Sequence, residues 1–360
     1  MVLCSVFPVL SQEIDPFKQA LPGYEYSFPR DFYSHEDYRI EWWYYTGNLR
    51  DESNREFGYQ LTFFRVALDP DKALSNPSQW KIDHIYFAHM TVSDLKDEKF
   101  YFFERINRPS LGLAGAASNK LHVWNEDWEL KQEGPGHRLV ALENETGLDL
   151  SLVPGKPLVI HGNDGVSQKG EGEGNASHYF SFTRMATTGT VTIKGKPYKV
   201  SGTSWMDHEY SSNQLNPTQI GWDWFSLKLN DGTELMLYQI RLKDGGIDPY
   251  SSGTRVTSSG KPQHIKKGEY KIRATGKWKS DRSGIEYPSG WNIQIPDKKI
   301  DLVIKPDMEG QELFELRSIN RSYWEGSVTV SGTSKGEQVK GKGYVELVGY
   351  GKALEQQLPE

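Results

Sequence analysis

The chain has 360 residues, a length typical of about two domains, and it is rich in aromatic residues (12%) and glycine (35 residues). Aromatic side chains and frequent glycine favour β-strands and tight turns over helices. The formal net charge of −6, without clustered basic residues, argues against nucleic acid as a partner, because phosphate binding needs grouped Lys and Arg. Cys4 is the only cysteine, so the chain has no internal disulfide and no cysteine-based zinc site. No apolar run approaches the roughly 18 residues of a transmembrane helix.

The first ten residues, MVLCSVFPVL, are apolar and differ from the sequence that follows them. Two interpretations are open: the remnant of an export signal, with Cys4 as a lipidation site, or an ordinary N-terminal segment or strand. A complete signal peptide has a basic start, and here no Lys or Arg precedes Lys18. The export interpretation predicts a secreted or periplasmic protein and leaves peripheral or lipid-anchored membrane association open. Residues 1–23 are therefore treated as an N-terminal extension.

From residue 41 onward the sequence consists of short strand-like segments separated by turns. Pro16, Pro22 and Pro29 break any helix before this point, so residues 11–38 form an extended lead-in. Strands are predicted at residues 41–49, 57–68, 81–93, 100–104, 122–131, 138–143, 148–153, 177–185, 189–194, 198–204, 222–229, 234–242, 270–278, 291–295, 300–304, 322–331 and 343–348. The polar run 211–219 is the best linker and separates domains at residues 24–214 and 215–360. This pattern predicts an all-β fold of antiparallel sandwiches or barrels.

An internal repeat supports two copies of one unit. Two short motifs recur in the same order and at nearly equal spacing: Trp43-Tyr44 as Trp224-Phe225, and Tyr59-Gln60-Leu61 as Tyr238-Gln239-Ile240. Chance similarity between hairpins is the alternative. Duplication predicts two related barrels, and closing each unit as a barrel removes exposed strand edges.

Residues 201–229, SGTSWMDHEYSSNQLNPTQIGWDWFSLKL, mix large aromatic side chains with ionisable groups. Such a mixture is typical of a concave site, where a few polar groups lie in an apolar lining. Side chains alternate along a strand, so the segment 205–210 should present two different faces. The two faces carry Trp205, Asp207 and Glu209 on one side, and Met206, His208 and Tyr210 on the other.

The candidate catalytic groups all lie in this stretch: Asp207, His208, Glu209 and Asp223. Two carboxylates on one face could share a proton and act as a general acid, whereas His208 would donate a proton in a different pocket. The structural alternative is that Asp207 caps a turn and His208 packs at the domain junction. Asp223 shares its face with apolar residues, so burial would raise its pKa and suit it to protonate an alkene. A salt bridge from Asp223 to an Arg such as Arg241 is the equal alternative.

The candidate ligand-binding residues are aromatic and polar side chains of the predicted strands: Trp43, Tyr45, His89, Trp205, Tyr210, Trp222, Trp224, Tyr238 and Gln239. His84 and His89 are an odd number of residues apart, so on one strand they face opposite ways and cannot share a metal. His89 is predicted to point inward, where a histidine more often completes core hydrogen bonds than catalyses. The chain has no His-Glu-x-x-His metal motif and no Gly-x-Ser-x-Gly nucleophile motif, and no metal or cofactor is predicted.

Five blocks resemble the AttH-like family, which is related to hydroxyneurosporene synthase, a carotenoid 1,2-hydratase. In order they are Pro29 to Gly47 with Glu41-Trp42-Trp43-Tyr44, Ser177-His-Tyr-Phe-Ser181 with Thr183-Arg184, Trp205-Met-Asp-His-Glu209, Gly221-Trp-Asp-Trp224 and Gly343-Tyr-Val-Glu-Leu347. The resemblance implies two lipocalin-like (calycin-type) barrels packed together, with a pocket for a large apolar ligand near their junction. The lipocalin Gly-x-Trp signature is absent, and the block at 221–224 only approximates it.

The resemblance also implies several activities. Carotenoid hydratases add water across a terminal isoprenoid double bond without a redox cofactor. Related fungal lipocalin-like proteins are described as catalysing cycloadditions, and AttH-type proteins as secreted hydrolases. Fold alone therefore does not settle the reaction.

The leading hypothesis is a protein that binds a lipid or isoprenoid near the barrel junction and catalyses cofactor-free hydration or another acid-catalysed alkene reaction. Asp223 or Asp207 would protonate the alkene, aromatic faces would stabilise the carbocation, and His208 or Glu209 would guide the water. The first alternative is a non-catalytic lipid carrier of the cell envelope, which needs the apolar pocket but not the acids. The second is a secreted carbohydrate hydrolase that uses Asp207 and Glu209, ranked last because of its apolar surroundings.

Overall fold

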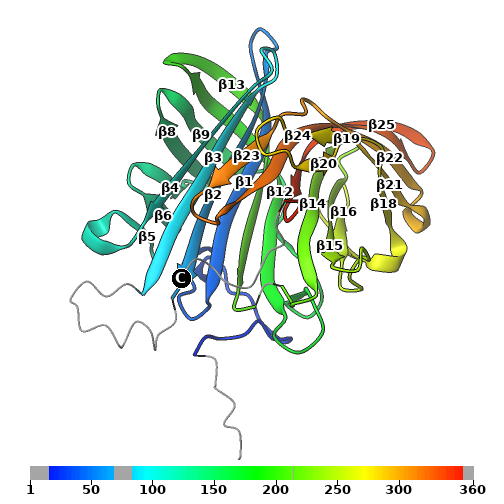
Figure 1. Ribbon diagram of the computed structural model, residues 1–360, viewed down its shortest axis with the longest axis horizontal. Helices are drawn as coiled ribbons and strands as arrows, with labels where there is room; N and C mark the ends of the chain where they lie inside the picture. The colour runs from blue at the N-terminus through cyan, green and yellow to red at the C-terminus, as the bar shows by residue number, and fades with distance from the viewer. Residues whose placement is uncertain (1–15, 69–82, 214, 352–360) are drawn as a thin grey trace, which may run out of the picture.

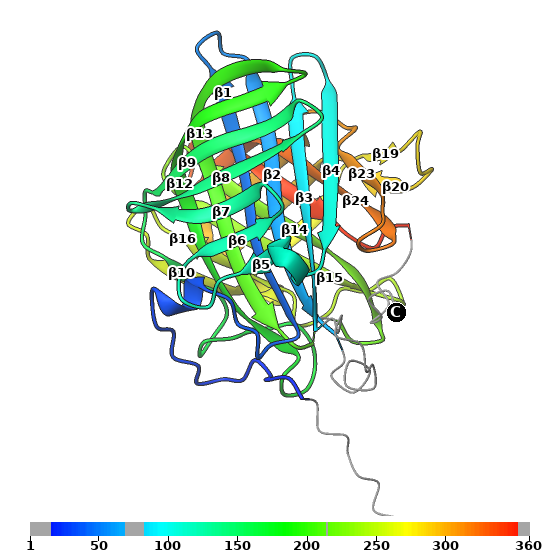
Figure 2. The same ribbon diagram turned by 90° about the vertical axis from the view of Figure 1, so that its left-hand side faces the viewer.

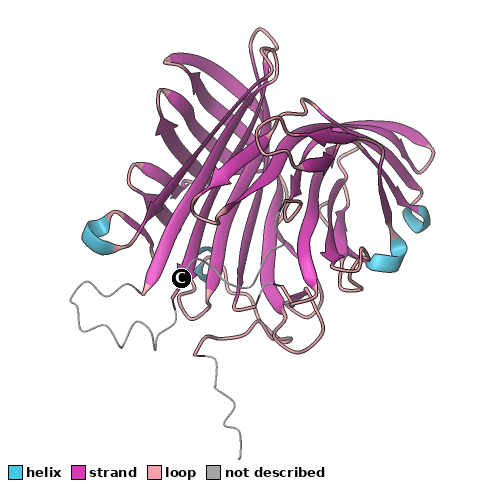
Figure 3. Cartoon of the chain, viewed as in Figure 1, coloured by secondary structure: helices cyan, strands magenta, loops and turns pink. Residues whose placement is uncertain are grey.

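The computed structural model describes residues 16–68, 83–213 and 215–351, and its elements are almost all β-strands (Figure 1 and Figure 3). The apolar first ten residues, and with them Cys4 and the proposed export signal, lie outside the described residues. The described chain also contains short 3-10 helices: η1 (Arg30–Phe32), η2 (Ser110–Gly112), η3 (Lys267–Glu269) and η4 (Pro296–Lys298). Within this part of the chain, no helix has the length and hydropathy needed to cross a bilayer.

The first sheet is antiparallel and curls into a nearly closed barrel (Figure 2). Its strands are β1 (Ile40–Asp51), β2 (Glu56–Ala67), β3 (His84–Asp94), β4 (Lys99–Asn107), β5 (Ala114–Ala116), β6 (His122–Asn125), β7 (Trp128–Glu133), β8 (Gly136–Glu143), β9 (Thr146–Pro154), β10 (Val159–Ile160), β11 (Ser167–Gln168), β12 (Ala176–Ile193) and β13 (Lys196–Ser211). Their order is β4-β3-β2-β1-β13-β12-β9-β8-β7-β6-β5, and β10 and β11 pair with β12.

The second sheet curls around an apolar core of its own (Figure 1). Its strands are β14 (Gln219–Leu229), β15 (Glu234–Leu242), β16 (Ser252–Val256), β17 (Pro262–Lys266), β18 (Lys271–Ala274), β21 (Trp291–Ile295), β22 (Ile300–Pro306), β23 (Glu312–Leu316), β24 (Arg321–Ser334) and β25 (Glu337–Leu347). Their order is β17-β16-β15-β14-β25-β24-β22-β21-β18, with β23 paired to β24. A separate small hairpin joins β19 (Lys277–Lys279) and β20 (Glu286–Pro288).

The two sheets repeat one topology, which supports the predicted duplication. In each, the first four strands run outward from the centre as a meander, and the last strand of the unit pairs with the first: β13 with β1, and β25 with β14. The repeated motifs therefore lie on corresponding strands of the two units, but their corresponding side chains point to different faces of the sheets. Trp43 packs in the core of the first barrel, whereas Trp224 belongs to the cluster between the sheets.

Burial along the strands shows which of them form the junction between the sheets. Exposed and buried residues alternate along β21 and β22, as expected for strands with one face in water. In contrast, β1, β3, β14 and the second half of β13, residues 204–211, are buried on nearly every residue. One face of these strands covers a barrel core, and the other packs against the opposite sheet, where β1 contacts β25 and β2 contacts β24. The junction has its own apolar cluster, which includes Tyr44, Trp205 and Trp224.

Candidate functional site

A cavity of about 130 Å³ lies at this junction. Its lining comes from both sheets and from the connection between them: Trp42, Tyr44, Thr62, Phe64, Lys169, Ser177, Tyr179, Asp207, Glu209, Ser211, Asn213, Leu215, Trp222, Trp224, Tyr238, Ile240 and Glu346. Trp42, Phe64, Trp222 and Glu346 are partly exposed and mark the open end, whereas Asp207, Glu209 and Tyr44 are buried. The cavity is therefore an aromatic pocket with two carboxyl groups in its buried part and a third, Glu346, nearer its opening.

The alternation predicted for the segment 205–210 is confirmed by the strand register. Asp207 pairs with Tyr44 and Glu209 with Trp42, and all four side chains line the cavity. The alternate residues, among them His208, face the core of the first barrel. The sequence therefore separates correctly the groups that can act together at the junction from those that cannot.

Asp207 is held by three donors in the buried part of the cavity. The Tyr179 hydroxyl donates to Oδ2 at 2.8 Å, the Trp205 indole Nε1 donates to Oδ1 at 2.6 Å, and the Ser181 hydroxyl also donates to Oδ1. Tyr179 in turn accepts a hydrogen bond from the Trp224 indole of the second sheet, at 3.2 Å. Burial raises the pKa of Asp207 to about 7, although the three donors favour the ionised form.

Glu346 is the corresponding acid of the second sheet. It lies on β25 opposite Trp224, as Asp207 lies on β13 opposite Tyr44. A single indole donates to it, from Trp222 Nε1 to Oε2 at 2.7 Å. Burial raises the pKa of Glu346 to about 7. The cavity thus contains two carboxyl groups, one from each unit, that both change protonation near neutral pH.

Replacing Glu346 with Gln is expected to make stability less dependent on pH. The folded-state pKa of Glu346 is raised from 4.5 to about 7, so folding takes up a proton between these values. The stability contributed by this group is therefore full below pH 4.5 and is lost as pH rises through 7. Urea unfolding from about pH 4 to pH 8 should show the Gln variant gaining up to about 3 kcal/mol relative to wild type. The exposed Glu286→Gln variant serves as the control, and a constant difference between Glu346→Gln and wild type would contradict the assignment.

Glu209 is already neutralised by a neighbouring cation. The Lys169 ammonium lies 3.3 Å from Glu209 Oε1, and the Ser177 hydroxyl donates to the same carboxylate. Burial opposes the charge on Lys169, but Glu209 beside it raises the pKa of the lysine above its usual value. The same ammonium lies over the rings of Tyr179 and Tyr238, at 5.0 and 4.2 Å from their centroids. Glu209 is therefore a structural partner of Lys169, and the free ring faces of the pocket are those of its tryptophans.

Asp223 and Gln239, both predicted as site residues, lie on the opposite face of the second sheet and away from the cavity. Asp223 pairs across the strands with Gln239, next to Phe225 of the second core. The Arg241 guanidinium donates to Asp223 Oδ1 at 3.1 Å, and the Tyr350 hydroxyl donates at 2.9 Å. The salt bridge expected for Asp223 is therefore present, and burial also raises the pKa of this carboxyl, as expected. Asp223 was predicted to be the acid that the second sheet contributes to the site. The acid of this sheet that lines the cavity is Glu346, on the neighbouring strand β25.

Trp43, Tyr45, His208 and Tyr210 also lie outside the cavity, because they face the first barrel. Trp43 and Tyr45 are fully buried in its core, and the Tyr45 hydroxyl is bonded to His137 at 2.8 Å. Trp42 and Tyr44, the adjacent residues on the same strand, line the cavity instead. A shift of one residue along a strand moves a side chain to the opposite face of the sheet. The predicted Trp222, Trp224 and Tyr238 do line the cavity, and Trp205 supports it through Asp207.

His89 points the other way from the prediction, toward the second sheet instead of the barrel interior. Its Nδ1 is bonded to the Tyr323 hydroxyl at 2.9 Å, and its Nε2 to the Ser318 hydroxyl at 2.8 Å. Burial lowers the pKa of His89 to about 4, so the ring is neutral at physiological pH. With both nitrogens occupied and no place in the cavity lining, His89 fastens the two sheets together.

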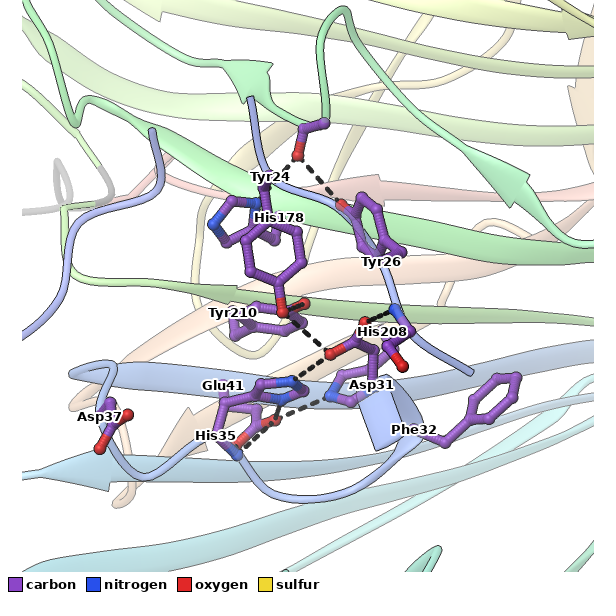
Figure 4. A network of polar contacts seen from close by, with 12 residues as sticks. Tyr24, Tyr26, Asp31, Phe32, His35, Asp37, Glu41, His178, His208 and Tyr210 are labelled. Atoms are coloured by element: carbon purple, nitrogen blue, oxygen red, sulfur yellow. Dashed lines mark hydrogen bonds and ion pairs between the residues drawn. The ribbon is translucent and has the colours of Figure 1, made fainter. Parts of the chain in front are cut away.

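A second buried polar cluster closes the base of the first barrel (Figure 4). Glu41 Oε1 lies 2.8 Å from His35 Nδ1 and 2.8 Å from His208 Nε2, and Glu41 Oε2 accepts from Arg65 Nε at 3.1 Å. His35 also reaches Asp31 through Nε2 at 3.2 Å. Arg65 donates to the main-chain oxygen of His35, so the network attaches the lead-in to the barrel.

The cluster includes the only group of described residues with a metal-ligand composition: His35, Glu41 and His208. Its charges are balanced by protein groups. Burial opposes the charge on His35, but the two carboxylates raise its pKa, whereas burial lowers the pKa of His208. A charged His35 and Arg65 then offset Glu41 and Asp31, with His208 neutral. His208 Nδ1 is buried without a hydrogen-bond partner among the described residues, but the charges of the cluster balance one another, and we interpret this cluster as structural.

Several cavity residues were not singled out from the sequence: Trp42, Tyr44, Lys169, Tyr179 and Glu346. Four of them lie within blocks that carried the family resemblance, at 41–44, 177–181 and 343–347. Alternation along each block would have grouped Tyr179 with Ser181, and pairing of strands would have placed both beside Asp207. Lys169 lies in a glycine-rich loop, and no local pattern marks its contact with Glu209.

The fold and the site together define a class: two packed antiparallel β-barrel units with an acid-bearing aromatic cavity between them. The AttH-like family model matches residues 19–350, and the chain belongs to this family, as its sequence blocks predicted. A putative AttH from Nitrosomonas europaea is similar at 33% identity, with a TM-score of 0.83 over 93% of this chain and all of the other. No protein with a curated description matches the chain.

Two further solved structures share the fold at lower identity. Kievitone hydratase from Nectria haematococca is similar at 16% identity, with a TM-score of 0.67 over 94% of this chain and 98% of the other. CghA, solved with Sch210972, is similar at 12% identity, with a TM-score of 0.57 over 94% of this chain and 97% of the other. Both likenesses concern the fold alone, and they agree with the predicted pair of lipocalin-like units.

Proposed function

We propose that this protein is an enzyme that adds water to a carbon–carbon double bond, or removes it, at the end of an apolar ligand held in the junction cavity. The observation that carries the proposal is the pair of carboxyl groups in the cavity, the buried Asp207 and the partly exposed Glu346, with pKa values raised to about 7. Hydration needs one protonated acid and one ionised base in the same site, and two groups that titrate near pH 7 can supply both.

The hydrogen bonds assign the two roles. Three donors favour the ionised form of Asp207, which makes it the base, whereas Glu346 has one donor and is the better acid. Glu346 gives its proton to one alkene carbon, and the carbocation forms on the other, near the faces of Trp42 and Trp222. Water adds to that carbon and loses its proton to Asp207. One double bond and one water become an alcohol, with both protons accounted for.

The size of the cavity limits what it can enclose. At about 130 Å³ it is comparable to cavities that take up benzene, so it fits one ring or one branched five-carbon unit. A large lipid or isoprenoid would place only its reacting end here, with the remainder leaving past Trp42 and Trp222. This refines the expectation of a pocket for a whole large ligand. That one protein of this fold is named a hydratase agrees with the proposal.

The carboxyl groups of the cavity also decide between this enzyme and the two alternatives, a lipid carrier and a carbohydrate hydrolase. A lipid carrier needs the aromatic lining but not two carboxyl groups with raised pKa values, one of them buried at a cost in stability, so the acids favour an enzyme. The carbohydrate hydrolase needed Asp207 with Glu209, and Glu209 is neutralised by Lys169. Export remains a proposal based on the apolar first ten residues alone; fractionation of the host cell tests it.

Ligand binding is tested with geraniol, an alkene that ends in an isoprenoid unit, and with lipids extracted from protein purified from its host. Binding should quench tryptophan fluorescence, since Trp42, Trp222 and Trp224 surround the cavity. Ile240→Trp should fill the cavity and weaken binding at least about tenfold, because an overfilled site excludes its ligand. Val303→Trp, on the exposed face of β22, is the matched control. Equal binding by both variants would place the ligand elsewhere.

A further inference from the structure

A buried polar layer lies behind the cavity, between the two sheets. We use this name for seven residues whose side chains each have a buried polar atom without a hydrogen-bond partner among the described residues: Tyr44, Thr46, Gln60, Thr91, Ser226, Glu325 and Tyr344. They come from β1, β2 and β3 on one side and from β14, β24 and β25 on the other. So many unpaired groups in one layer indicate a route for protons or water and are costly in a purely structural interface.

The layer is closed at the end away from the cavity. The Asn48 amide donates to the Ser327 hydroxyl at 2.9 Å, and the Ser93 hydroxyl donates to Gln311 at 2.8 Å, so the two sheets are joined directly. They approach so closely that a Cβ on Gly58 would lie 2.6 Å from the Tyr344 hydroxyl. The other end of the layer reaches the cavity at Tyr44, which belongs to both.

Glu325 lies beside the proposed acid. It pairs directly with Glu346 across β24 and β25, so the two side chains share a face and their Cβ atoms are roughly 4.5–5.5 Å apart. Burial, and then the neighbouring Glu346, raise the pKa of Glu325 well above its ordinary value. Two adjacent buried carboxyls do not ionise together, and Glu325 therefore keeps its proton when Glu346 loses its own.

Tyr44 lies between the proposed base and the two glutamates. On its own sheet it is the direct strand partner of Asp207. The Tyr44 hydroxyl is fully buried, which raises its pKa. The carboxylates of Glu325 and Glu346, on the opposite sheet, raise this pKa further. Its neighbour Tyr45 faces the barrel core instead and is bonded to His137. Tyr44 is therefore the hydroxyl that can join the acid of one sheet to the acid of the other.

We propose that Tyr44 and Glu325 return the proton from Asp207 to Glu346 after each hydration. This inference rests on the proposed function, which leaves the proton on Asp207 and none on Glu346. Asp207 gives its proton to the Tyr44 oxygen, the Tyr44 hydroxyl proton passes to Glu325, and the Glu325 proton passes to Glu346. One proton moves in total, and Tyr44 and Glu325 end as they began. The acid is thereby reset by groups within the protein.

Infrared spectroscopy tests this arrangement without any substrate. At about pH 8, above the pKa values near 7, wild type should retain a protonated carboxyl band that is lost in Glu325→Gln. Tyr44→Phe should shift this band, because it removes the hydroxyl beside the carboxyl, whereas Tyr45→Phe should leave it unchanged. Absence of the band in wild type, or a band indifferent to Tyr44→Phe, would overturn the proposal whether or not the protein is a hydratase.

Turnover experiments separate this inference from the proposed function. With an alkene that wild type hydrates, Tyr44→Phe should complete about one turnover per site and then slow by about tenfold or more relative to its own first turnover, since the reset is impaired. Tyr45→Phe should show neither effect. Steady turnover of Tyr44→Phe at the wild-type rate would overturn the relay but leave the hydratase intact. Absence of hydration by wild type would instead overturn the proposed function.

Discussion

Replacing Glu346 with Gln, or Asp207 with Asn, is expected to lower the rate of alkene hydration by about 10²–10⁴-fold, with ligand affinity changed by about threefold or less. Each substitution keeps the size of the side chain but removes its ability to give or take a proton. Asp207 lies in the buried part of the cavity and Glu346 beside Trp222 nearer its opening, and both substitutions leave the apolar lining intact. The loss should therefore appear in kcat, measured by mass spectrometry of the alcohol formed, and not in fluorescence titrations.

Asp223→Asn is the matched control for this prediction. Asp223 is an acid of the same sheet, one strand from Glu346, but its carboxylate is bonded to Arg241 and faces the second core. Its substitution should cost stability and leave kcat nearly unchanged. A large loss of kcat in Asp223→Asn, with Glu346→Gln still active, would show that Asp223 is the proton donor, as predicted from the sequence. Unchanged activity in both cavity variants would contradict the assignment of these two acids, whereas ligand binding without any turnover by wild type would support the carrier.

The same pair sets the pH dependence of the reaction. Activity needs Glu346 protonated and Asp207 ionised, and both pKa values are raised to about 7 by burial. The rate should therefore be greatest near pH 7 and fall on both sides, on the acid side as Asp207 gains a proton and on the alkaline side as Glu346 loses one. The two pKa values belong to the pair, so a single substitution should abolish the bell shape and not merely displace it.

Strand alternation made the first half of the site predictable from the sequence. The placement of Trp205, Asp207 and Glu209 on one face depends only on the period of a β-strand, and the register confirms it. The family and the pair of β-barrel units were likewise predictable, because the blocks occur in order along the chain. Errors of one residue were the costly ones: choosing Trp43 and Tyr45 over their neighbours selected the wrong face of the strand.

What the sequence could not reveal was the pairing between distant strands. Glu346 is 139 positions beyond Asp207, and nothing in its local sequence shows that it faces the same cavity. Asp223 looked like the better acid because it lies between two tryptophans, yet alternation directs it to the opposite side. The direction of His89 could not be found either, since a strand between a barrel core and a second sheet is buried on both faces.

The largest loss of stability is expected for Glu41→Gln, at about 3–5 kcal/mol, the cost of breaking a buried ion pair from one side. The substitution leaves the Arg65 guanidinium without its carboxylate and removes the acceptor shared by His35 and His208. All four side chains are buried, so water does not replace the lost interactions. Urea unfolding near neutral pH measures the loss. Glu56→Gln, which breaks a half-exposed pair with Lys342, should cost less than about 1 kcal/mol.

The effect of this substitution should depend on pH in a definite direction. The pKa of Glu41 is lowered below 4.5, since His35, His208 and Arg65 outweigh burial, so its contribution is full above pH 4.5 and is lost as pH falls through the folded value. The pKa of His35 is raised above 6.5, so its contribution is full below pH 6.5 and is lost as pH rises through the folded value. The difference between wild type and Glu41→Gln should therefore be greatest between pH 4.5 and 6.5. A difference that is constant across the whole range would mean that the network is held by neutral hydrogen bonds, with His35 uncharged. Because this network attaches the lead-in to the barrel and lies on the face opposite Asp207, ligand binding in the cavity should survive wherever the variant remains folded.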